Sequence, residues 1–202
     1  MFVEKWFSTP IFYHQLEYEE FDSVQAQIAP AIEKIKKSDL SNPWGDTVET
    51  SFKYNGNSNF IVDHNLSLLE DVVLKCADSY LNQCTDESNK LNVGLKQSWV
   101  NVSNKDQFQF EHQHLAPFTT VIISGVYYFQ TNEHDGDTTF LSPNPYQSAG
   151  FSIFGEHKVT YKPQVGKLVL FPSWLRHRVE PNTTNDERIS ITVNLAHFPN
   201  LK

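Results

Sequence analysis

Residues 110–128 read FEHQHLAPFTTVIISGVYY, and they place two histidines one residue apart directly before a long apolar run. Residues i and i+2 of an extended segment project to the same side of a strand. His112 and His114 can therefore converge on one point while Glu111 and Gln113 face away. This spacing is typical of metal ligands. Because catalytic metals usually take three protein ligands, a third ligand is expected elsewhere in the chain.

The sequence around this stretch predicts a mainly β fold. From residue 91 onward, turn signals divide short β-rich runs, which read GLKQSWVNVS, QFQFEHQH, TTVIISGVYYFQ, DTTFLS, GKLVLFPSW and RISITVNLAHF. Asp135-Gly136 and the PQVG segment at 163–166 mark two of the turns. Several short strands at this spacing predict a β-sandwich or a jelly roll.

The first ninety residues carry helical patterns instead. Residues 22–37 have apolar side chains at helical spacing, although Pro30 should kink or delay that helix. Residues 63–84 carry the clearer stripe, at i, i+3 and i+4, and Asp63 or Asn65 can cap its start. These helices need a sheet face to cover.

Length and composition limit the function classes. A chain of 202 residues with 39% hydrophobic content can bury one sizeable core, so we expect a single domain over 1–202, with a helical support region at 1–90 and the β core at 91–202. The net charge of −8 disfavours nucleic acid as a partner. The sequence shows neither an apolar run of about 18 residues nor a signal-peptide pattern, which predicts a cytoplasmic protein without a membrane partner.

The two cysteines fit that compartment. Cys76 and Cys84 fall on the second predicted helix, where eight positions separate them by about 12 Å, too far for a disulfide. We expect two reduced core thiols.

One strand raises the question of which face is buried. In residues 188–195, RISITVNL, the even positions are polar and the odd positions are apolar. The polar face would ordinarily contact solvent. In a jelly roll with a polar cavity inside and helices outside, the assignment is reversed. The strand alone fits both arrangements.

The third histidine lies in LFPSWLRHRVEP at 170–181, which supplies His177, and Arg188 follows at the start of the next strand. Here the sequence resembles the Fe(II)- and 2-oxoglutarate-dependent oxygenases, and within them the prolyl hydroxylase type. Their pattern is His-x-Asp or His-x-Glu, a distal His, and then an Arg or Lys, often in Arg-x-Ser. The match reads HQH at 112–114, His177 and RIS at 188–190.

The resemblance covers about half the chain, over residues 99–198, and is closest to small uncharacterised oxygenases of bacteria and their phages. It implies a double-stranded β-helix of the jelly-roll, cupin-like kind preceded by two helices. It also implies Fe(II), 2-oxoglutarate and stimulation by ascorbate, with hydroxylation of an unactivated C–H bond and release of succinate and CO₂. The leading substrate is a prolyl residue of a peptide or protein. If the chain is phage-encoded, it would act in the host cytoplasm.

By this resemblance His112, His114 and His177 are the metal ligands, three on one face of an octahedron. Position 114 departs from the pattern, because the family usually has a carboxylate there. Three neutral imidazoles leave the double positive charge of the ion intact. Three-histidine Fe(II) sites are known in related cupin-type dioxygenases. Asp135 or Asp137 is the alternative to His114.

The resemblance also implies the cosubstrate contacts. The planar guanidinium of Arg188 suits the distal carboxylate of 2-oxoglutarate, and Ser190 faces the same way. Tyr128 matches a family tyrosine that binds the same carboxylate, and a packed core tyrosine is its alternative. Asn101 and Asn194 are expected to line the same cavity, because a buried amide needs partners.

Other readings stay open. Trp174 and Arg176 flank the distal histidine and are candidate substrate contacts. The substrate could instead be a nucleobase, lipid or small metabolite. The chain could be a three-histidine cupin-like dioxygenase that does not use 2-oxoglutarate, in which case Arg188 would be dispensable. It could also be a noncatalytic jelly-roll binding module that holds a structural metal.

Overall fold

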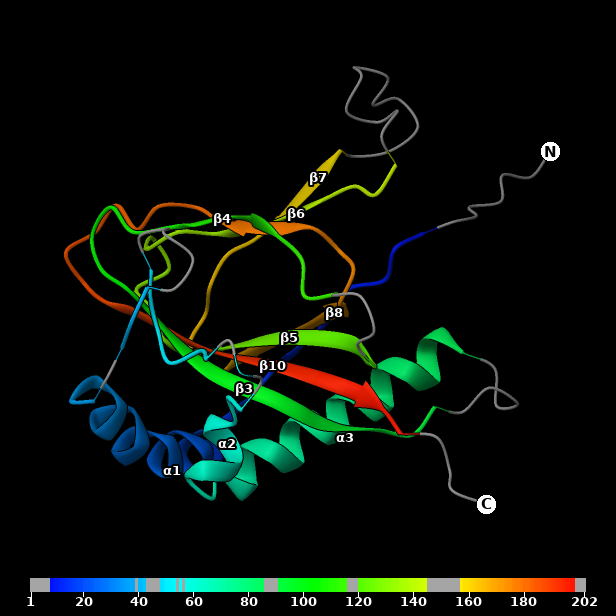
Figure 1. Cartoon of the computed structure of the whole chain (residues 1–202), viewed down its shortest axis with the longest axis horizontal. Coiled ribbons are helices and arrows are strands. Elements are labelled where there is room, and N and C mark those ends of the chain that lie inside the picture. The colour runs from blue at the N-terminus through cyan, green and yellow to red at the C-terminus, as the bar shows by residue number, and fades with distance from the viewer. Residues whose placement is uncertain are drawn as a thin grey trace.

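A computed structural model describes residues 8–38, 40–42, 48–53, 55, 57–85, 91–115, 120–144 and 157–198. Two antiparallel β-sheets face one another, and helices cover the outer face of the larger sheet (Figure 1). The predicted mainly β architecture, a jelly roll with supporting helices, is confirmed.

The larger sheet has six strands. Their order is β1 (Phe12–Gln15), β8 (Lys167–Pro172), β5 (Val121–Gln130), β10 (Arg188–His197), β3 (Val93–Ser103) and β2 (Glu49–Thr50). The smaller sheet has four strands in the order β4 (Gln109–His112), β9 (His177–Val179), β6 (Thr138–Leu141) and β7 (Lys158–Tyr161). The edge strands β1 and β2 come from the part of the chain for which the sequence predicted helices alone.

The helices are α1 (Tyr18–Lys36), α2 (Phe60–Asp63) and α3 (Ser67–Cys84). The first begins earlier than predicted and runs through Pro30, which is exposed. The predicted caps of the second helix are wrong, because Asp63 ends α2 and Asn65 lies in the turn with φ +53°. Gln27 of α1 instead accepts the backbone N–H of Leu68 at 3.0 Å, so a neighbouring helix satisfies the start of α3.

Strand β10 has both faces buried, and its alternation separates two environments. Its odd positions pack against the helices and form one core with them: Ile189, Ile191, Val193 and Leu195 join Val24, Ile28, Leu69 and Val73. Each such side chain contributes about 1.5–3 kcal/mol through burial. Its even positions face the space between the sheets: Arg188, Ser190, Thr192 and Asn194. The reversed assignment, with the polar face inside, is the one found.

Two further expectations can be compared with the structure. None of the helices in the described ranges has the length and apolarity needed to cross a bilayer. Cys76 and Cys84 are both free thiols, but only Cys76 is buried, so the expectation of two core thiols is wrong for Cys84.

Candidate metal centre and active site

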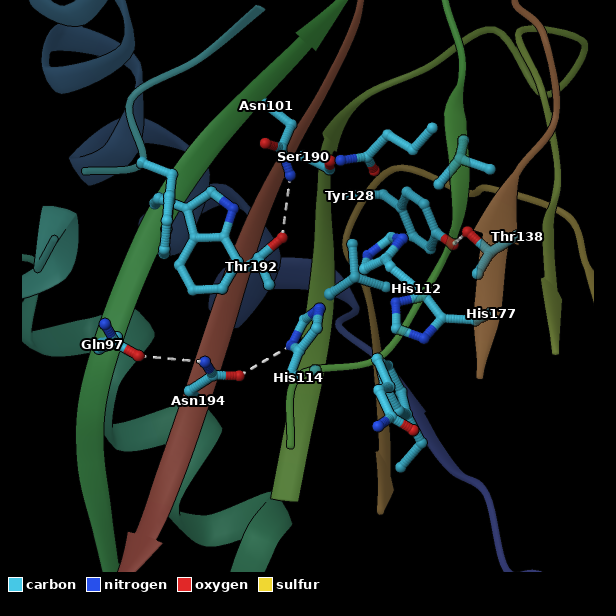
Figure 2. A pocket seen from close by; sticks show the side chains of 18 of the residues that line it. Gln97, Asn101, His112, His114, Tyr128, Thr138, His177, Ser190, Thr192 and Asn194 are labelled. Carbon is cyan, nitrogen blue, oxygen red and sulfur yellow. Dashed lines mark hydrogen bonds between the residues drawn. The ribbon is translucent and has the colours of Figure 1, made fainter. Parts of the chain in front are cut away.

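Strands β4 and β9 bring the three predicted metal ligands together. The antiparallel register pairs His112 directly with His177, and their ring centroids lie 4.3 Å apart. His114 follows β4, with its ring centroid 5.5 Å from His112 and 5.1 Å from His177 (Figure 2). One nitrogen from each ring lies within 4.8 Å of the others, so a single ion can contact all three.

Each of the three rings makes a hydrogen bond through Nδ1, which leaves Nε2 for the cavity. His112 and His177 place Nδ1 on the backbone carbonyl oxygen two residues earlier, at 2.7 and 3.0 Å. His114 places Nδ1 on Oδ1 of Asn194 at 2.8 Å. A neutral imidazole that donates from Nδ1 carries its lone pair on Nε2, the atom that binds a metal. The three Nε2 atoms therefore form a donor set for one ion.

The site favours neutral imidazoles. Burial, together with the neighbouring His112, lowers the pKa of His114 to about 3. Burial and the other two rings also hold the pKa of His177 well below its usual value. The ring of Phe171, 4.8 Å from that of His177 between centroids, adds apolar surface. At neutral pH, a metal ion would find His114 and His177 already deprotonated.

Ser173 explains why the position of His114 is well defined. Its carbonyl oxygen accepts the backbone N–H groups of His114 and Leu115 at 2.9 and 3.0 Å. Its own N–H bonds to the carbonyl of Ile122, and its hydroxyl donates to the carbonyl of Val121 at 2.9 Å. This buried serine of the FPSW segment thus joins β5 to the backbone that carries the metal-ligand candidate.

Arg188 lies elsewhere in the same cavity and is only 3% exposed. Its Nη1 donates to the carbonyl oxygens of Gly136 at 2.8 Å and Asp135 at 3.4 Å, and its Nη2 donates to Oγ of Ser103 at 3.0 Å. Gly136 has φ +102°, and a Cβ there would lie 2.2 Å from the carbonyl oxygen of Glu180 and 3.1 Å from Nη1 of Arg188. Glycine is therefore required for this turn to close on the guanidinium.

The guanidinium has no ion pair with a carboxylate of the described residues, although it is buried. Tyr128 and Ser190 line the same cavity, and the hydroxyl of Tyr128 is 2.8 Å from Oγ1 of Thr138 (Figure 2). Burial raises the pKa of Tyr128, so its phenol stays protonated and can donate a hydrogen bond. Arg188 is thus a buried cation beside the hydroxyls of Tyr128 and Ser190 in the cavity wall, an arrangement that suits an anionic ligand.

The cavity measures about 460 Å³ and opens between the two sheets. Its lining within the described chain contains no Asp or Glu, although the protein as a whole is acidic. It includes all eight residues predicted for metal and cosubstrate, namely His112, His114, His177, Arg188, Ser190, Tyr128, Asn101 and Asn194. Asn101 donates to Oγ1 of Thr192 at 3.0 Å, while its buried Oδ1 has no partner in the described chain.

The other candidates lie elsewhere. Arg176 pairs with Glu111 at 2.6 Å and Trp174 is 40% exposed, and neither lines the cavity. The carboxylate of Asp135 accepts the hydroxyl of Thr131 and thereby shapes the turn that holds Arg188. In the described part of the chain the metal-binding group consists of histidines, so Asp135 and Asp137 do not replace His114.

Several residues of the site lie outside the set predicted from the sequence. Thr138 and Ser103 contact predicted residues, and the Phe52 and Trp99 rings form an edge-on pair at 4.9 Å in the cavity wall. Strand periodicity could have identified two of them, because Trp99, Asn101 and Ser103 alternate along β3 and share one face.

Comparison with known proteins agrees with this geometry. Residues 97–194 match the family model described as "Putative 2OG-Fe(II) oxygenase", a segment that contains all three histidines and Arg188. No curated protein sequence matches the chain. The matched segment spans just under half of the chain, and the chain also has the fold of these enzymes, so it is similar to the 2OG-Fe(II) oxygenase superfamily in sequence and in fold.

Solved structures show how widely the fold extends. A Pseudomonas putida prolyl-4-hydroxylase superposes with a TM-score of 0.64 at 15% identity, covering 95% of this chain and 94% of that one. The alpha-ketoglutarate-dependent epimerase SnoN from nogalamycin biosynthesis gives 0.66 at 15% identity, with 93% and 77% coverage. A prolyl hydroxylase from Trichoplax adhaerens, in complex with a hypoxia inducible factor peptide fragment, gives 0.60 at 16% identity, with 93% and 83% coverage.

Proposed function

We propose that the protein is an Fe(II)- and 2-oxoglutarate-dependent dioxygenase that hydroxylates an unactivated C–H bond, with a prolyl residue of a peptide or protein as the leading substrate. The observation that carries the proposal is the shared cavity. Three convergent imidazoles and one buried guanidinium without a carboxylate partner in the described chain line the same pocket.

The donor set fits Fe(II). His112, His114 and His177 would hold the ion through Nε2, and imidazole nitrogen is a suitable ligand for iron as well as for zinc and copper. Three ligands leave positions open for a cosubstrate. The usual carboxylate is replaced by a neutral ring, so the chain's own ligands do not reduce the ion's charge.

The charge balance of the pocket favours a dianionic cosubstrate. An Fe(II) ion and Arg188 together bring three positive charges into a lining without acidic side chains in the described chain. 2-Oxoglutarate would return two negative charges. Arg188 would bind its distal carboxylate, with Tyr128 and Ser190 as further hydrogen-bonding groups. In a dioxygenase without this cosubstrate, Arg188 would serve only to hold the turn at Gly136 and the hydroxyl of Ser103.

Each part of the pocket then has a defined task. Bound Fe(II), with 2-oxoglutarate and O₂, supplies the oxidising power for hydroxylation, and the cosubstrate leaves as succinate and CO₂. The imidazoles hold the ion through hydrogen bonds that fix their tautomers. Arg188 orients the cosubstrate, and the apolar side chains of Val126 and Phe171 limit water in the pocket.

The substrate assignment rests on the wall beside His114. The Trp99 ring lies 5.6 Å from that of His114, and Phe52 packs edge-on against Trp99. Such an aromatic corner suits the compact apolar ring of proline. Trp174 and Arg176 would contact the flanking peptide outside the cavity. Similarity to the Pseudomonas putida prolyl-4-hydroxylase over nearly the whole of both chains supports the same choice.

A small metabolite is the second candidate substrate. Two observations favour it: the fold is equally similar to SnoN, an epimerase, and a cavity of about 460 Å³ is within the range of small-molecule sites, about 300–1,000 Å³.

Product analysis tests the proposal. Purified protein with Fe(II), ascorbate and O₂ should convert 2-oxoglutarate to succinate slowly without substrate and faster with it. A library of proline-containing peptides, screened by mass spectrometry for the gain of one oxygen atom, should contain substrates. If succinate forms but no peptide gains oxygen, the small-molecule candidate replaces the prolyl one. If no succinate forms in any mixture, the dioxygenase assignment is wrong.

A further inference from the structure

A chain of polar side chains supports His114 from behind. Oδ1 of Asn194 accepts from Nδ1 of His114 at 2.8 Å and from the hydroxyl of Ser124 at 2.7 Å, and Nδ2 of Asn194 donates to Oε1 of Gln97 at 3.3 Å. Figure 2 shows the series from Gln97 through Asn194 to His114. His112 and His177 each place Nδ1 on a backbone carbonyl, whereas His114 places Nδ1 on a side chain.

The sheet places these residues side by side. Asn194 on β10 is paired in register with Ser124 on β5 and with Gln97 on β3, so the network crosses three adjacent strands at one level. The β10–β3 register shifts directly after this pair, between Asn194 and Leu195. Such irregularities redirect side chains and are common beside active sites. Ser124 is fully buried and Asn194 is 4% exposed, so water cannot readily replace either partner.

The orientation of the amide decides which nitrogen of His114 is free. With Oδ1 towards the ring, His114 must donate from Nδ1, and Nε2 carries the lone pair. With the amide reversed, Nδ2 would donate to Nδ1, the proton would move to Nε2, and the ring could not bind an ion inside the cavity. The buried hydroxyl of Ser124 favours the first orientation, because a reversed amide would leave its hydrogen without an acceptor among the described residues.

We infer that Asn194 is a positioning residue that holds His114 in its metal-binding tautomer, at the ligand position where related oxygenases use a carboxylate. The inference rests on the proposed metal site. A carboxylate ligand needs no such support, because either of its oxygens can bind without a choice of tautomer. A histidine at this position does need a hydrogen-bond partner, since a ring without one can rotate or carry its proton on Nε2, the nitrogen that should bind the metal.

Two substitutions distinguish the role of the accepting oxygen of Asn194 from that of its NH₂ group. Asn194→Leu has similar size and no acceptor, so it removes the contact to His114. Asn194→Asp can only accept, so it must keep the ring protonated on Nδ1, and Gln97 can turn its own amide to donate to the second oxygen. Asn59→Leu is the matched control, because Oδ1 of Asn59 also accepts from a serine hydroxyl, that of Ser98 at 2.9 Å, and Asn59 lies outside the cavity lining.

The experiment is a titration of metal-free protein with Co(II) in the absence of 2-oxoglutarate, followed by the visible ligand-field spectrum. We expect one ion per wild-type chain. Asn194→Leu should lose about 10- to 100-fold in affinity, the usual effect of removing a partner of a ligating histidine, and should show an altered spectrum. Asn194→Asp should bind at least as tightly as the wild type, and Asn59→Leu should bind as tightly as the wild type.

A proton–nitrogen NMR spectrum of the wild-type metal-free protein reads the tautomer directly and requires no variant to fold. A proton on Nδ1 of His114 is expected, and a proton on Nε2 would overturn the inference. Equal Co(II) affinity of the wild type and Asn194→Leu would also overturn it while leaving the proposed function intact. Failure of the wild type to bind Co(II) would remove the metal site and the proposed function together.

Discussion

Replacement of Arg188 by leucine should weaken 2-oxoglutarate binding without affecting the metal. Arg188 is 3% exposed, and three acceptors of the described chain share its five N–H donors, so donors remain for a ligand carboxylate. Arg188→Leu removes these donors together with the positive charge, because Arg188 is the one arginine or lysine in the described cavity lining. Arg188→Lys keeps the charge but loses the planar fork.

The magnitude follows from the burial. A hydrogen bond to a charged group contributes about 1.5–3 kcal/mol, and a bidentate pair contains two. Loss of one partner of a buried pair commonly costs about 2–5 kcal/mol. Because Arg188 is almost fully screened from water, we expect Arg188→Leu to lose about 3–5 kcal/mol of binding free energy for 2-oxoglutarate. This loss raises the dissociation constant about 100- to 4,000-fold. Arg188→Lys should fall between this variant and the wild type.

Anaerobic calorimetry on Fe(II)-loaded protein measures the effect, and Fe(II) affinity in the absence of cosubstrate checks that the histidines are intact. Arg178→Leu is the control, since Arg178 is partly exposed and pairs with Glu180 at 2.8 Å outside the cavity lining. If Arg188→Leu bound 2-oxoglutarate as tightly as Arg178→Leu does, the cosubstrate assignment would be wrong.

Three further outcomes are expected. His177→Ala should abolish metal retention, measured by metal analysis after gel filtration, and a variant that keeps one ion per chain would show that His177 is not a ligand. Gly136→Ala should lower the free energy of unfolding by about 1–3 kcal/mol in urea and weaken 2-oxoglutarate binding, because its Cβ meets Glu180 and Arg188; an unchanged midpoint would refute the strain. The metal-free protein should be fully stable above pH 6.5 and lose stability towards pH 3. In this range the unfolded chain protonates His114 and His177, whereas the folded protein, in which their pKa values are low, does not, so acid favours unfolding. Denaturant titrations between pH 6.5 and pH 3 measure this pH dependence of the free energy of unfolding, which should be smaller in His177→Leu.

Much of the site follows from strand periodicity. The two-residue spacing of His112 and His114 predicts that they converge, and the alternation of β10 predicts one polar and one apolar face. The alternation alone does not determine which face of β10 points into the cavity, because that depends on the helices that cover the sheet. Those helices bury Ile189 and Ile191, which leaves the polar face for the cavity.

The missed features depend on contacts between distant segments. Residues 63–84 were expected to form one helix because the apolar stripe is continuous, yet Gln27 of α1 provides the hydrogen bond that starts α3 at a later residue. The support of His114 by Asn194 likewise depends on strand register, which no spacing within one strand reveals. Strands β1 and β2 are too short to give a clear period, and both are defined by pairing at a sheet edge.

Anaerobic addition of Fe(II) and 2-oxoglutarate to the purified protein tests the central claim most directly. If three imidazoles and Arg188 hold the ion and the cosubstrate in one cavity, a visible charge-transfer band should appear only when both are present, at one equivalent of each per chain. Absence of the band, together with Zn(II) that stays tightly bound through purification, would contradict the account and identify a noncatalytic metal-containing binding module.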